Sequence, residues 1–501
     1  MKKGLLHKQI VIFNRVIDKI IFAHVVVVGV PTILYYCLLV NGWDLLALQF
    51  LIPTCYLLTS LVVIGEATII AFWYSSKSKL KLQRGLLQRF SRFPRIASTH
   101  SRAKLLARKH QLPRCTFIVV AYLPNEQNII LDTLKYILMN VERPQDGLEV
   151  ILAYNSPVSL PVEDDLQHLA NLYPELRLLC VEGSRSKAEN LNAALQIITG
   201  EITCILDADH WPTAGCLRRA WRWLASDRYD VVQGRNVIRN HNCNLLTKIV
   251  SVEFECLYGV SHTAKSLLVD TAIFGGSNGY WRTAVLRYIH FCPDMMTEDI
   301  DTTLRALLEG HRIVHDPSIV ATELAPVDLQ SLWSQRKRWA QGWLEVTLKH
   351  QWSLLRSDKL DAWQKIYWTI LLFYSVLFHF IALQVLPIIF SLALSNGSPP
   401  SFIDHHVWVV TLLTLLSAPY QTLVAMRMKN SITEYSFTDF MLYCLAIPFY
   451  CLLKNIIAIT AAYDHLLGET KWVVTRRGLR AHYPRVMTAS STDSSPTWVR
   501  R

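Results

Sequence analysis

Two kinds of hydrophobic pattern alternate along the chain. Long apolar runs occupy residues 20–40 and 45–74, and each is long enough for a helix of about 20 residues that crosses a bilayer. Two further apolar runs, at 366–394 and 407–426, follow a middle region at about 115–350 in which polar and apolar residues are mixed. The pattern therefore predicts a soluble domain inserted between membrane helices.

The last apolar stretch, at 437–463, is interrupted by Pro448 and by the pair Lys454 and Asn455. Its uninterrupted part is short for a span, so we expect a re-entrant or interfacial hairpin, with a full span as the alternative. A hairpin would leave the C-terminal tail on the side of the soluble domain, whereas a fifth span would place the tail on the opposite side.

Basic residues indicate the orientation of the chain. The segment from Ser75 to Pro113 contains many Lys and Arg residues and no acid, and the N-terminal flank carries Lys2, Lys3 and Lys8. Because cytoplasmic loops are enriched in Lys and Arg, both segments and the soluble domain are expected in the cytoplasm. The segment is either a solvated linker or a surface for anionic lipid. No nucleic-acid-binding motif accompanies it, so nucleic acid is not an expected partner.

Composition narrows the class of protein. Hydrophobic residues make up 51% of the 501 residues, charged residues only 18%, and the net charge is +12. Soluble domains average about 25% charged residues, so a disordered chain and a purely cytosolic enzyme are both disfavoured. The 11 cysteines lack the spacing of a zinc site, which argues against a structural metal and a disulfide scaffold.

The middle region has the pattern of an α/β domain. Short runs rich in β-branched residues alternate with helical segments, the strands being expected at 116–121, 148–153, 176–181 and 202–206 and the helices at 128–139, 166–172 and 186–198. This alternation predicts a mostly parallel sheet with helices on both faces. Ligands of such sheets bind at the carboxyl ends of the strands.

Three polar motifs carry candidate chemistry. The first, ILDADH, places Asp207 and Asp209 directly after an expected strand. Two carboxylates at this spacing can hold a hard cation, Mg²⁺ or Mn²⁺, through oxygen ligands. The alternative is a surface turn or a helix cap.

The second motif, MMTEDID, contains Thr297, Glu298, Asp299 and Asp301. A carboxylate beside an anionic site can have a raised pKa and serve as a general base. The alternative is an acidic first turn of a helix at 300–308, which the helix dipole favours. We prefer the alternative for Asp301 and the catalytic role for Asp299.

The third motif, QRKRW, places Gln335, Arg338 and Trp339 on one face of a helix. Arg binds phosphate through its fork of N–H donors, and an indole offers a flat surface for a sugar ring. The alternative is an amphipathic helix at the lipid headgroups, with Trp333 and Trp343 as anchors. The two interpretations are compatible.

These three motifs, in this order between membrane helices, resemble the membrane-embedded family-2 glycosyltransferases, such as cellulose, chitin, hyaluronan and poly-N-acetylglucosamine synthases. The resemblance is strong over 115–350. In the membrane regions it rests on the arrangement of the apolar segments around this domain. It implies a cytoplasmic catalytic domain of GT-A type in a multi-pass protein of the plasma (inner) membrane. The implied boundaries are two N-terminal membrane helices at 1–75, a basic linker at 76–114, the GT-A domain at 115–330, an interface helix at 331–362, C-terminal membrane helices with a broken segment at 363–465, and a cytoplasmic tail at 466–501.

The resemblance also implies the activity, which is inverting transfer from a nucleotide sugar, UDP-glucose or UDP-N-acetylglucosamine, to a growing β-linked polysaccharide that is exported across the membrane. Its partners would be the donor, the glycan acceptor, the lipid bilayer and accessory export subunits. Two alternatives remain. One is a single transfer to a lipid or lipid-linked acceptor, and the other is a catalytically inert membrane subunit.

Site residues follow from the same resemblance. Asp299, with Glu298 beside it, would be the catalytic base, and Asp209 with Asp207 would hold Mg²⁺ or Mn²⁺. The residues implied in substrate binding are Tyr122, Pro124, Asn125 and Glu126 at the nucleotide, Lys187 at the diphosphate with Asn190 and Asn192 supporting it, Asp207 on the nucleotide side, Gly275, Gly276, Ser277 and Asn278 at the acceptor end, Gln335, Arg338 and Trp339 at the diphosphate and acceptor sugar, and Trp472, Thr475 and Arg476 in a gating loop.

The sequence departs from the family pattern at one point. Many relatives carry a pair of Asp residues after the second strand, one of which contacts uracil. Here Tyr154 and Asn155 stand at this place. Asn155 can replace one hydrogen bond and Tyr154 can stack on a base, so the pattern leaves the choice of base open.

Overall fold

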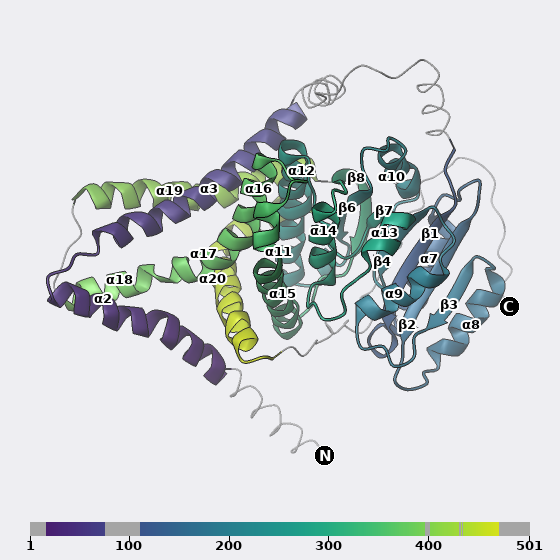
Figure 1. Ribbon diagram of the computed structural model, residues 1–501, viewed down its shortest axis with the longest axis horizontal. Helices are drawn as coiled ribbons and strands as arrows, with labels where there is room; N and C mark the ends of the chain where they lie inside the picture. The colour runs from purple at the N-terminus through teal and green to yellow at the C-terminus, as the bar shows by residue number, and fades with distance from the viewer. Residues whose placement is uncertain (1–16, 76–110, 396–400, 430–431, 433, 470–501) are drawn as a thin grey trace.

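The computed structural model describes residues 17–75, 111–395, 401–429, 432 and 434–469. Long apolar helices lie at one end of the molecule and a mixed α/β domain lies at the other (Figure 1). The domain is inserted between the second and third long apolar helices.

A single eight-stranded sheet forms the centre of the α/β domain. Four parallel strands make one half, in the order β3 (Leu176–Cys180), β2 (Leu148–Asn155), β1 (Cys115–Tyr122) and β4 (Ile202–Asp207). The sheet continues with β7 (Gly279–Arg282), which is antiparallel to both its neighbours, then β6 (Val231–Ile238), β8 (Ile313–Glu323) parallel to β6, and the short β5 (Trp211–Pro212). The mostly parallel sheet predicted from the sequence is confirmed.

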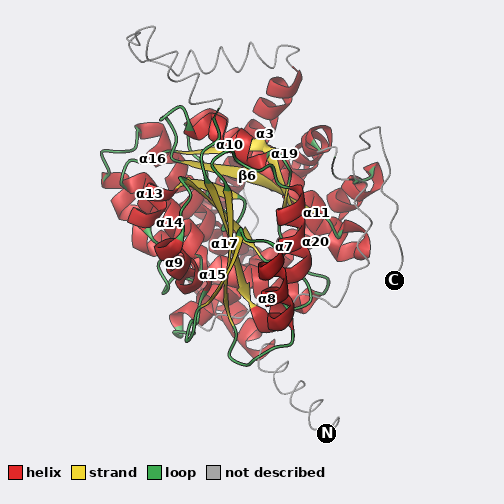
Figure 2. Cartoon of the chain, turned by 90° about the vertical axis from the view of Figure 1, so that its right-hand side faces the viewer, coloured by secondary structure: helices red, strands yellow, loops and turns green. Residues whose placement is uncertain are grey.

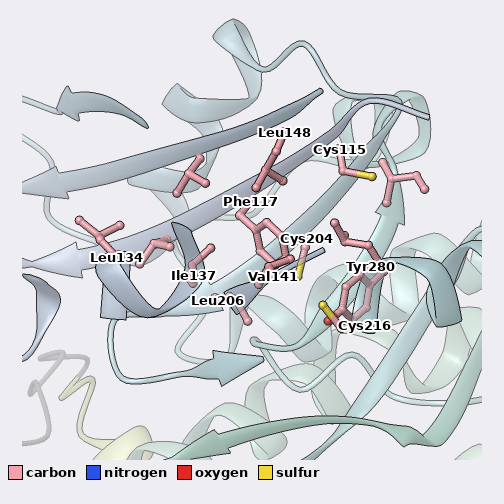
Figure 3. Close-up of a cluster of buried hydrophobic side chains, with 14 of the residues drawn as sticks. Cys115, Phe117, Leu134, Ile137, Val141, Leu148, Cys204, Leu206, Cys216 and Tyr280 are labelled. Atoms are coloured by element: carbon pink, nitrogen blue, oxygen red, sulfur yellow. The ribbon is translucent and has the colours of Figure 1, made fainter. Parts of the chain in front are cut away.

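Two hydrophobic layers cover the sheet. Side chains of β1 alternate between them, because successive residues of a strand point to opposite faces: Phe117 and Val119 face one layer, and Ile118 and Val120 face the other. The first layer, partly shown in Figure 3, packs under α7 (Ile130–Asn140), α8 (Val162–Leu172) and α10 (Cys216–Leu224). The second packs under α9 (Lys187–Ile197), α13 (Thr283–Ile289), α14 (Glu298–Leu308) and α15 (Leu329–Arg356). Helices therefore cover both faces of the sheet, which Figure 2 shows between them.

Five helices in the described residues are long and apolar enough to cross a membrane, at Ile17–Val40, Leu46–Tyr74, Ala362–Leu394, Ile403–Met428 and Phe437–Leu466. Their main elements are α2 (Val30–Val40), α3 (Leu46–Ser75), α16 (Ala362–Thr369), α17 (Ser375–Leu383), α18 (Val385–Leu394), α19 (Ser401–Met428) and α20 (Phe437–Leu466). Among these, α3 packs along α19 and α2 along α18.

The hairpin expected at 437–463 is wrong. These residues belong to the continuous helix α20, which contains Pro448 and begins at a capping box formed by Ser436 and Asp439. A proline removes only one backbone hydrogen bond from a helix. Here the loss is offset by packing on both sides of it, since Tyr443 and Tyr450 are buried in a cluster that joins residues of the α/β domain with residues of α3 and α19.

Helix α15 carries the third motif and was expected to lie at the lipid headgroups with Trp333 and Trp343 as anchors. Both tryptophans are partly buried, and Trp343 packs against the core of the domain. The exposed large apolar side chains of α15 are Leu329 at its first position and Leu348, Trp352 and Leu355 in its second half. The N-terminal half of α15 therefore serves as a wall of the domain.

Candidate active site

A cavity of about 480 Å³ opens at the carboxyl ends of β1, β2 and β4. Its wall also includes the start of α9, the loop before β7, the first turn of α14 and the first half of α15. This is the edge of the sheet at which open α/β folds bind ligands. The cavity brings the three sequence motifs to one place.

The first motif forms a carboxylate and imidazole cluster at the end of β4. Ligand atoms of Asp207, Asp209 and His210 all lie within 4.8 Å of one another. Asp207 faces the cavity. Asp209 is 1% exposed and accepts hydrogen bonds from the backbone N–H of Leu324 at 3.0 Å. Two carboxylates and one imidazole form a donor set that suits Mg²⁺ or Mn²⁺, so the residues present fit a divalent ion.

His210 extends this cluster towards β8. Its ring nitrogens lie 3.2 Å from Asp209 Oδ1 and 2.9 Å from Glu323 Oε2. Burial alone lowers the pKa of His210, but the charges of Glu323 and Asp209 outweigh it and raise the pKa to about 10. Without a cation nearby, this histidine is therefore positively charged at neutral pH and neutralises part of the acidic cluster.

Lys187, at the first position of α9, joins three parts of the wall. Its Nζ donates to Asp207 Oδ1 at 2.5 Å and to the carbonyl of Gly276 at 2.8 Å, and it lies 3.8 Å from Glu298 Oε1. Gly276 has φ +79°, and a Cβ there would lie 2.8 Å from Asp299 Oδ2. Only glycine combines this left-handed backbone with so close a carboxylate. A cation, a loop and an acid thus meet at one point.

Asp299 lies in the first turn of α14 with its Oδ1 accepting from the N–H of Ile300 at 2.9 Å. Burial and the neighbouring charge of Glu298 raise the pKa of Asp299 to about 7, although Lys187 and Arg338 oppose the shift. A carboxylate with such a pKa is half ionised near neutral pH. This is the property that a general base needs.

Asp301, two residues further on, has contacts that suit a structural role. It is 0% exposed and accepts hydrogen bonds from Arg305 at 2.7 Å and from Lys349 and His350 of α15 at 2.8 Å each. Burial alone would raise its pKa, but these three partners hold the pKa of Asp301 well below its usual range. The residue therefore anchors α14 to α15 and fixes the second motif against the third.

The third motif faces the cavity with the three residues predicted from its spacing, Gln335, Arg338 and Trp339. Gln335 is 8% exposed and its Oε1 has no hydrogen-bond partner among the described residues. Arg336 points the other way, where it pairs with Glu253 at 2.5 Å and stacks on the ring of Trp339 at 4.3 Å. The motif thus presents a cation, an amide and an aromatic ring to one ligand.

Most of the predicted site residues line this cavity. These are Tyr122, Glu126, Lys187, Asn190, Asp207, Gly275, Gly276, Ser277, Glu298, Asp299, Gln335, Arg338 and Trp339. Pro124, Asn125, Asn192, Asp209 and Asn278 do not line it. Asn192 instead bonds the backbone of Phe291, and Asn278, which is 0% exposed, donates to backbone carbonyls of β6 and β8. Trp472, Thr475 and Arg476 lie outside the described residues.

The structure adds residues that the sequence did not indicate. His210, Asn236, Phe254, Tyr258 and Glu323 also line the cavity. Of these residues, only His210 could have been found from the sequence, because it directly follows Asp209 in the first motif. Tyr258 belongs to a π-helix, Glu255–His262, a rare form that occurs often at functional sites and that no local pattern predicted.

Asn155 lines the cavity where many relatives carry an aspartate. Its side chain donates to the carbonyl of Ser184 at 3.0 Å and accepts from Asn190 Nδ2 at 2.9 Å. Half of its hydrogen-bonding capacity is therefore used within the protein. One donor and one acceptor position of the amide remain for a ligand.

The raised pKa of Asp299 gives a testable pH dependence. Only the ionised carboxylate can accept a proton, so kcat/KM should fall as the pH drops through about 7. Glu298→Gln removes a negative charge that raises this pKa and should move the acidic limb of the profile to lower pH. Rate profiles of the two proteins between pH 5 and 9 would test this, and an unmoved limb in the variant would contradict it.

A mostly parallel sheet, with an acidic cluster after β4 that fits a divalent ion, is the architecture of a glycosyltransferase with the GT-A fold. Two family descriptions match the chain, "Glycosyl transferase family 2" over residues 116–286 and "Glycosyl transferase family group 2" over residues 202–423. The chain therefore belongs to the family-2 glycosyltransferases, as the motifs predicted.

Similarity to named glycosyltransferases supports this assignment. The chain is 23% identical over 376 residues to the probable glycosyltransferase YdaM of Bacillus subtilis, covering 73% of this chain and 87% of that protein. It is 26% identical over 266 residues to a poly-beta-1,6-N-acetyl-D-glucosamine synthase of Staphylococcus epidermidis, covering 52% of this chain but only 63% of that synthase. A solved mannosyltransferase of Pyrobaculum calidifontis, in complex with GDP-Man and Mn²⁺, shares the fold with a TM-score of 0.53 at 20% identity, over 83% of this chain and 99% of that one.

Proposed function

We propose that this glycosyltransferase transfers a sugar, glucose or N-acetylglucosamine, from its UDP derivative to a hydroxyl of a growing β-linked polysaccharide. The observation that carries the proposal is the convergence of Lys187, Asp207, Asp299, Arg338 and Trp339 on one cavity. It provides cations for a diphosphate, a base for a hydroxyl and an aromatic surface for a sugar ring. The polymer product is supported by the poly-N-acetylglucosamine synthase among the relatives.

The donor diphosphate would lie between the end of β4 and α15. Lys187 and Arg338 supply fixed positive charge on two sides of it, and preorganised charge of this kind stabilises a leaving group without reorganisation. Asp207, Asp209 and His210 would hold Mg²⁺ or Mn²⁺. When bound, such an ion adds Lewis-acid stabilisation of the phosphate oxygens, and the solved mannosyltransferase contains Mn²⁺.

Asp299 accepts the proton of the acceptor hydroxyl in this mechanism. The hydroxyl oxygen then forms a bond to the anomeric carbon as the bond from that carbon to the diphosphate oxygen breaks, and the diphosphate leaves with the electron pair. Attack opposite the leaving group inverts the anomeric centre, so an α-linked donor gives a β-linked product. Asp301 keeps Asp299 in place by fixing α14 to α15.

The membrane helices fit an integral protein of the plasma (inner) membrane whose catalytic domain faces the cytoplasm, where nucleotide sugars are available. Export of the product along these helices, the gating role of Trp472, Thr475 and Arg476, and accessory export subunits are parts of the same proposal that rest on the family resemblance. The basic flanks of the first two membrane helices support the orientation.

A donor screen tests the proposed function. Purified protein in lipid nanodiscs with Mn²⁺ would be given UDP-glucose, UDP-N-acetylglucosamine and GDP-mannose in turn, and release of the nucleoside diphosphate would be measured. We expect release from a UDP sugar and a product that grows with time on a sizing gel. A discrete glycolipid would show a single transfer instead, and no release from any donor would support an inert subunit.

A further inference from the structure

The cavity extends from the proposed diphosphate site towards the end of β2. Asn155, the last residue of β2, is partly buried and lines the cavity. It pairs in register with Tyr122 of β1, while Val120 of β1 pairs with Asp207 of β4. Two strand spacings, about 10 Å in all, therefore separate Asn155 from the strand that ends in the metal cluster. The ribose of a nucleotide bridges a gap of this size, so Asn155 lies where the base of the donor is expected.

Two hydrogen bonds fix the direction of the Asn155 amide. Its Nδ2 donates to the carbonyl oxygen of Ser184 at 3.0 Å, and its Oδ1 accepts from Nδ2 of Asn190 at 2.9 Å. A carbonyl oxygen only accepts hydrogen bonds, so the amide nitrogen has to face Ser184. Turning the amide over would set oxygen against oxygen at Ser184 and nitrogen against nitrogen at Asn190. The side chain therefore presents one N–H and one oxygen lone pair to the cavity in a single, fixed order.

Both partners of the amide belong to the segment that carries Lys187. Ser184 lies in the loop before α9, and its hydroxyl donates to the carbonyl of Ser186, the N-cap of α9, at 3.2 Å. Asn190 belongs to α9 and is 2% exposed. Because Lys187 is the first residue of α9, the segment that holds the Asn155 amide also holds the cation assigned to the diphosphate.

A carboxylate at position 155 is not equivalent to this amide. It would bring a charged oxygen close to the carbonyl oxygen of Ser184, which Nδ2 now approaches at 3.0 Å, and two acceptors at this distance repel each other and lose the hydrogen bond. A carboxylate would also offer the base acceptors only. An aspartate here would therefore need a loop of different geometry, and Asn155 matches the loop present in this chain.

We propose that Asn155 selects the donor by the polarity of its base, favouring a keto base such as uracil over an amino base such as cytosine. In uracil, N3–H lies between two carbonyl oxygens, so Asn155 Oδ1 accepts from N3–H while Nδ2 donates to the neighbouring oxygen. This inference rests on the nucleotide donor of the proposed function. It does not depend on which sugar is transferred or on the length of the product.

The fixed direction of the amide is what makes it selective. Cytosine has the same size as uracil, but its N3 carries no proton, so in the same position it would face Oδ1 as a second acceptor. A free amide could turn over to correct this mismatch. The Asn155 amide is held by Ser184 and Asn190, so turning it over would break two hydrogen bonds within the protein.

Binding of UDP and CDP to the full-length protein in lipid nanodiscs with Mn²⁺ tests the proposal. The two nucleotides share the ribose and the diphosphate, so the ratio of their Kd values reports the contact with the base. We expect CDP to bind at least about tenfold more weakly, because one hydrogen bond is lost and two acceptors face each other. Equal Kd values would overturn this inference alone, whereas binding of neither nucleotide would overturn the proposed function as well.

Two variants of Asn155 extend the test. Asn155→Ala removes the amide, so neither base is read and the two Kd values should become nearly equal. Asn155→Asp should weaken the binding of UDP by about tenfold or more, because the carboxylate faces the Ser184 carbonyl. An unchanged ratio in Asn155→Ala, or tighter binding of UDP by Asn155→Asp, would overturn the proposal.

Asn171→Ala is the matched control. Asn171 is an exposed asparagine near the end of α8 that does not line the cavity, and its variant should keep the ratio of the parent protein. Because Asn155 also supports the loop before α9, the melting temperature of each variant would be measured alongside. The ratio of Kd values in the unchanged protein tests the proposal even where a variant does not fold.

Discussion

Replacing Asp299 by Asn should lower the rate of sugar transfer by about 10²- to 10⁴-fold, the usual contribution of a general base. The amide keeps the size of the side chain and can still accept from the N–H of Ile300, but it cannot take the proton of the acceptor hydroxyl. Nucleotide binding should change little, because the diphosphate contacts assigned to Lys187 and Arg338 are retained. Single-turnover rates and the Kd of UDP would be measured side by side.

The matched control for this variant is Asp301→Asn on the same helix. Asp301 holds Arg305, Lys349 and His350 without lining the cavity. The variant removes the fully buried charge that these three residues share, which destabilises the fold. We therefore expect a lower melting temperature and a smaller loss of rate than in Asp299→Asn. Near-normal turnover of Asp299→Asn would contradict its assignment as the base.

Replacing Asp209 by Asn should abolish activation by Mn²⁺ or Mg²⁺ and lower the activity more than about 100-fold, because a metal ion contributes several kcal/mol of charge stabilisation in the transition state. Asp209 is one of the three ligand-bearing residues whose atoms lie within 4.8 Å of one another. Its amide still accepts from Leu324 N–H, so the local fold is expected to persist. Titration of activity with Mn²⁺ after treatment with a chelator would measure the effect.

Asp164→Asn, an exposed position on α8, is the control for removal of a negative charge away from the cavity and should keep the parent's response to Mn²⁺. Metal binding by the Asp209 variant can be followed separately by the paramagnetic signal of free Mn²⁺. A variant that retained a normal Mn²⁺ response would show that Asp207 and His210 suffice, and Asp209 would then be a structural residue that supports the backbone of β8.

Several features of this protein followed from local sequence. Short apolar runs rich in β-branched residues predicted the strands β1 to β4, because a strand buried on both faces needs apolar side chains for both layers of the core. The helix expected at 186–198 corresponds to α9, whose N-cap Ser186 accepts a hydrogen bond from Glu189 N–H. The order of the three motifs indicated the family, since each supplies one part of a nucleotide-sugar site.

The later strands and the full wall of the cavity were not predictable in this way. Tyr258, Asn236 and Glu323 come from a π-helix and from β6 and β8, whose pairing joins segments that are distant in sequence. The raised pKa of Asp299 likewise depends on the burial and on the side chains that folding places around it. A spacing of residues does not contain this information.

Helix α20 shows most clearly what the local sequence does not determine. Its residues determined an apolar segment with a proline and a charged pair in the middle, and that composition fits a span, a hairpin or a helix on a surface. Tertiary structure excludes the hairpin, because these residues form one continuous helix. It also shows the partners of the charges, since Asp439 pairs with Lys248, Lys454 with Glu253, and Asp464 with Lys337 and Lys19. Hydropathy measures how apolar a segment is, whereas the side of the membrane on which its ends lie depends on the partners of its few charges.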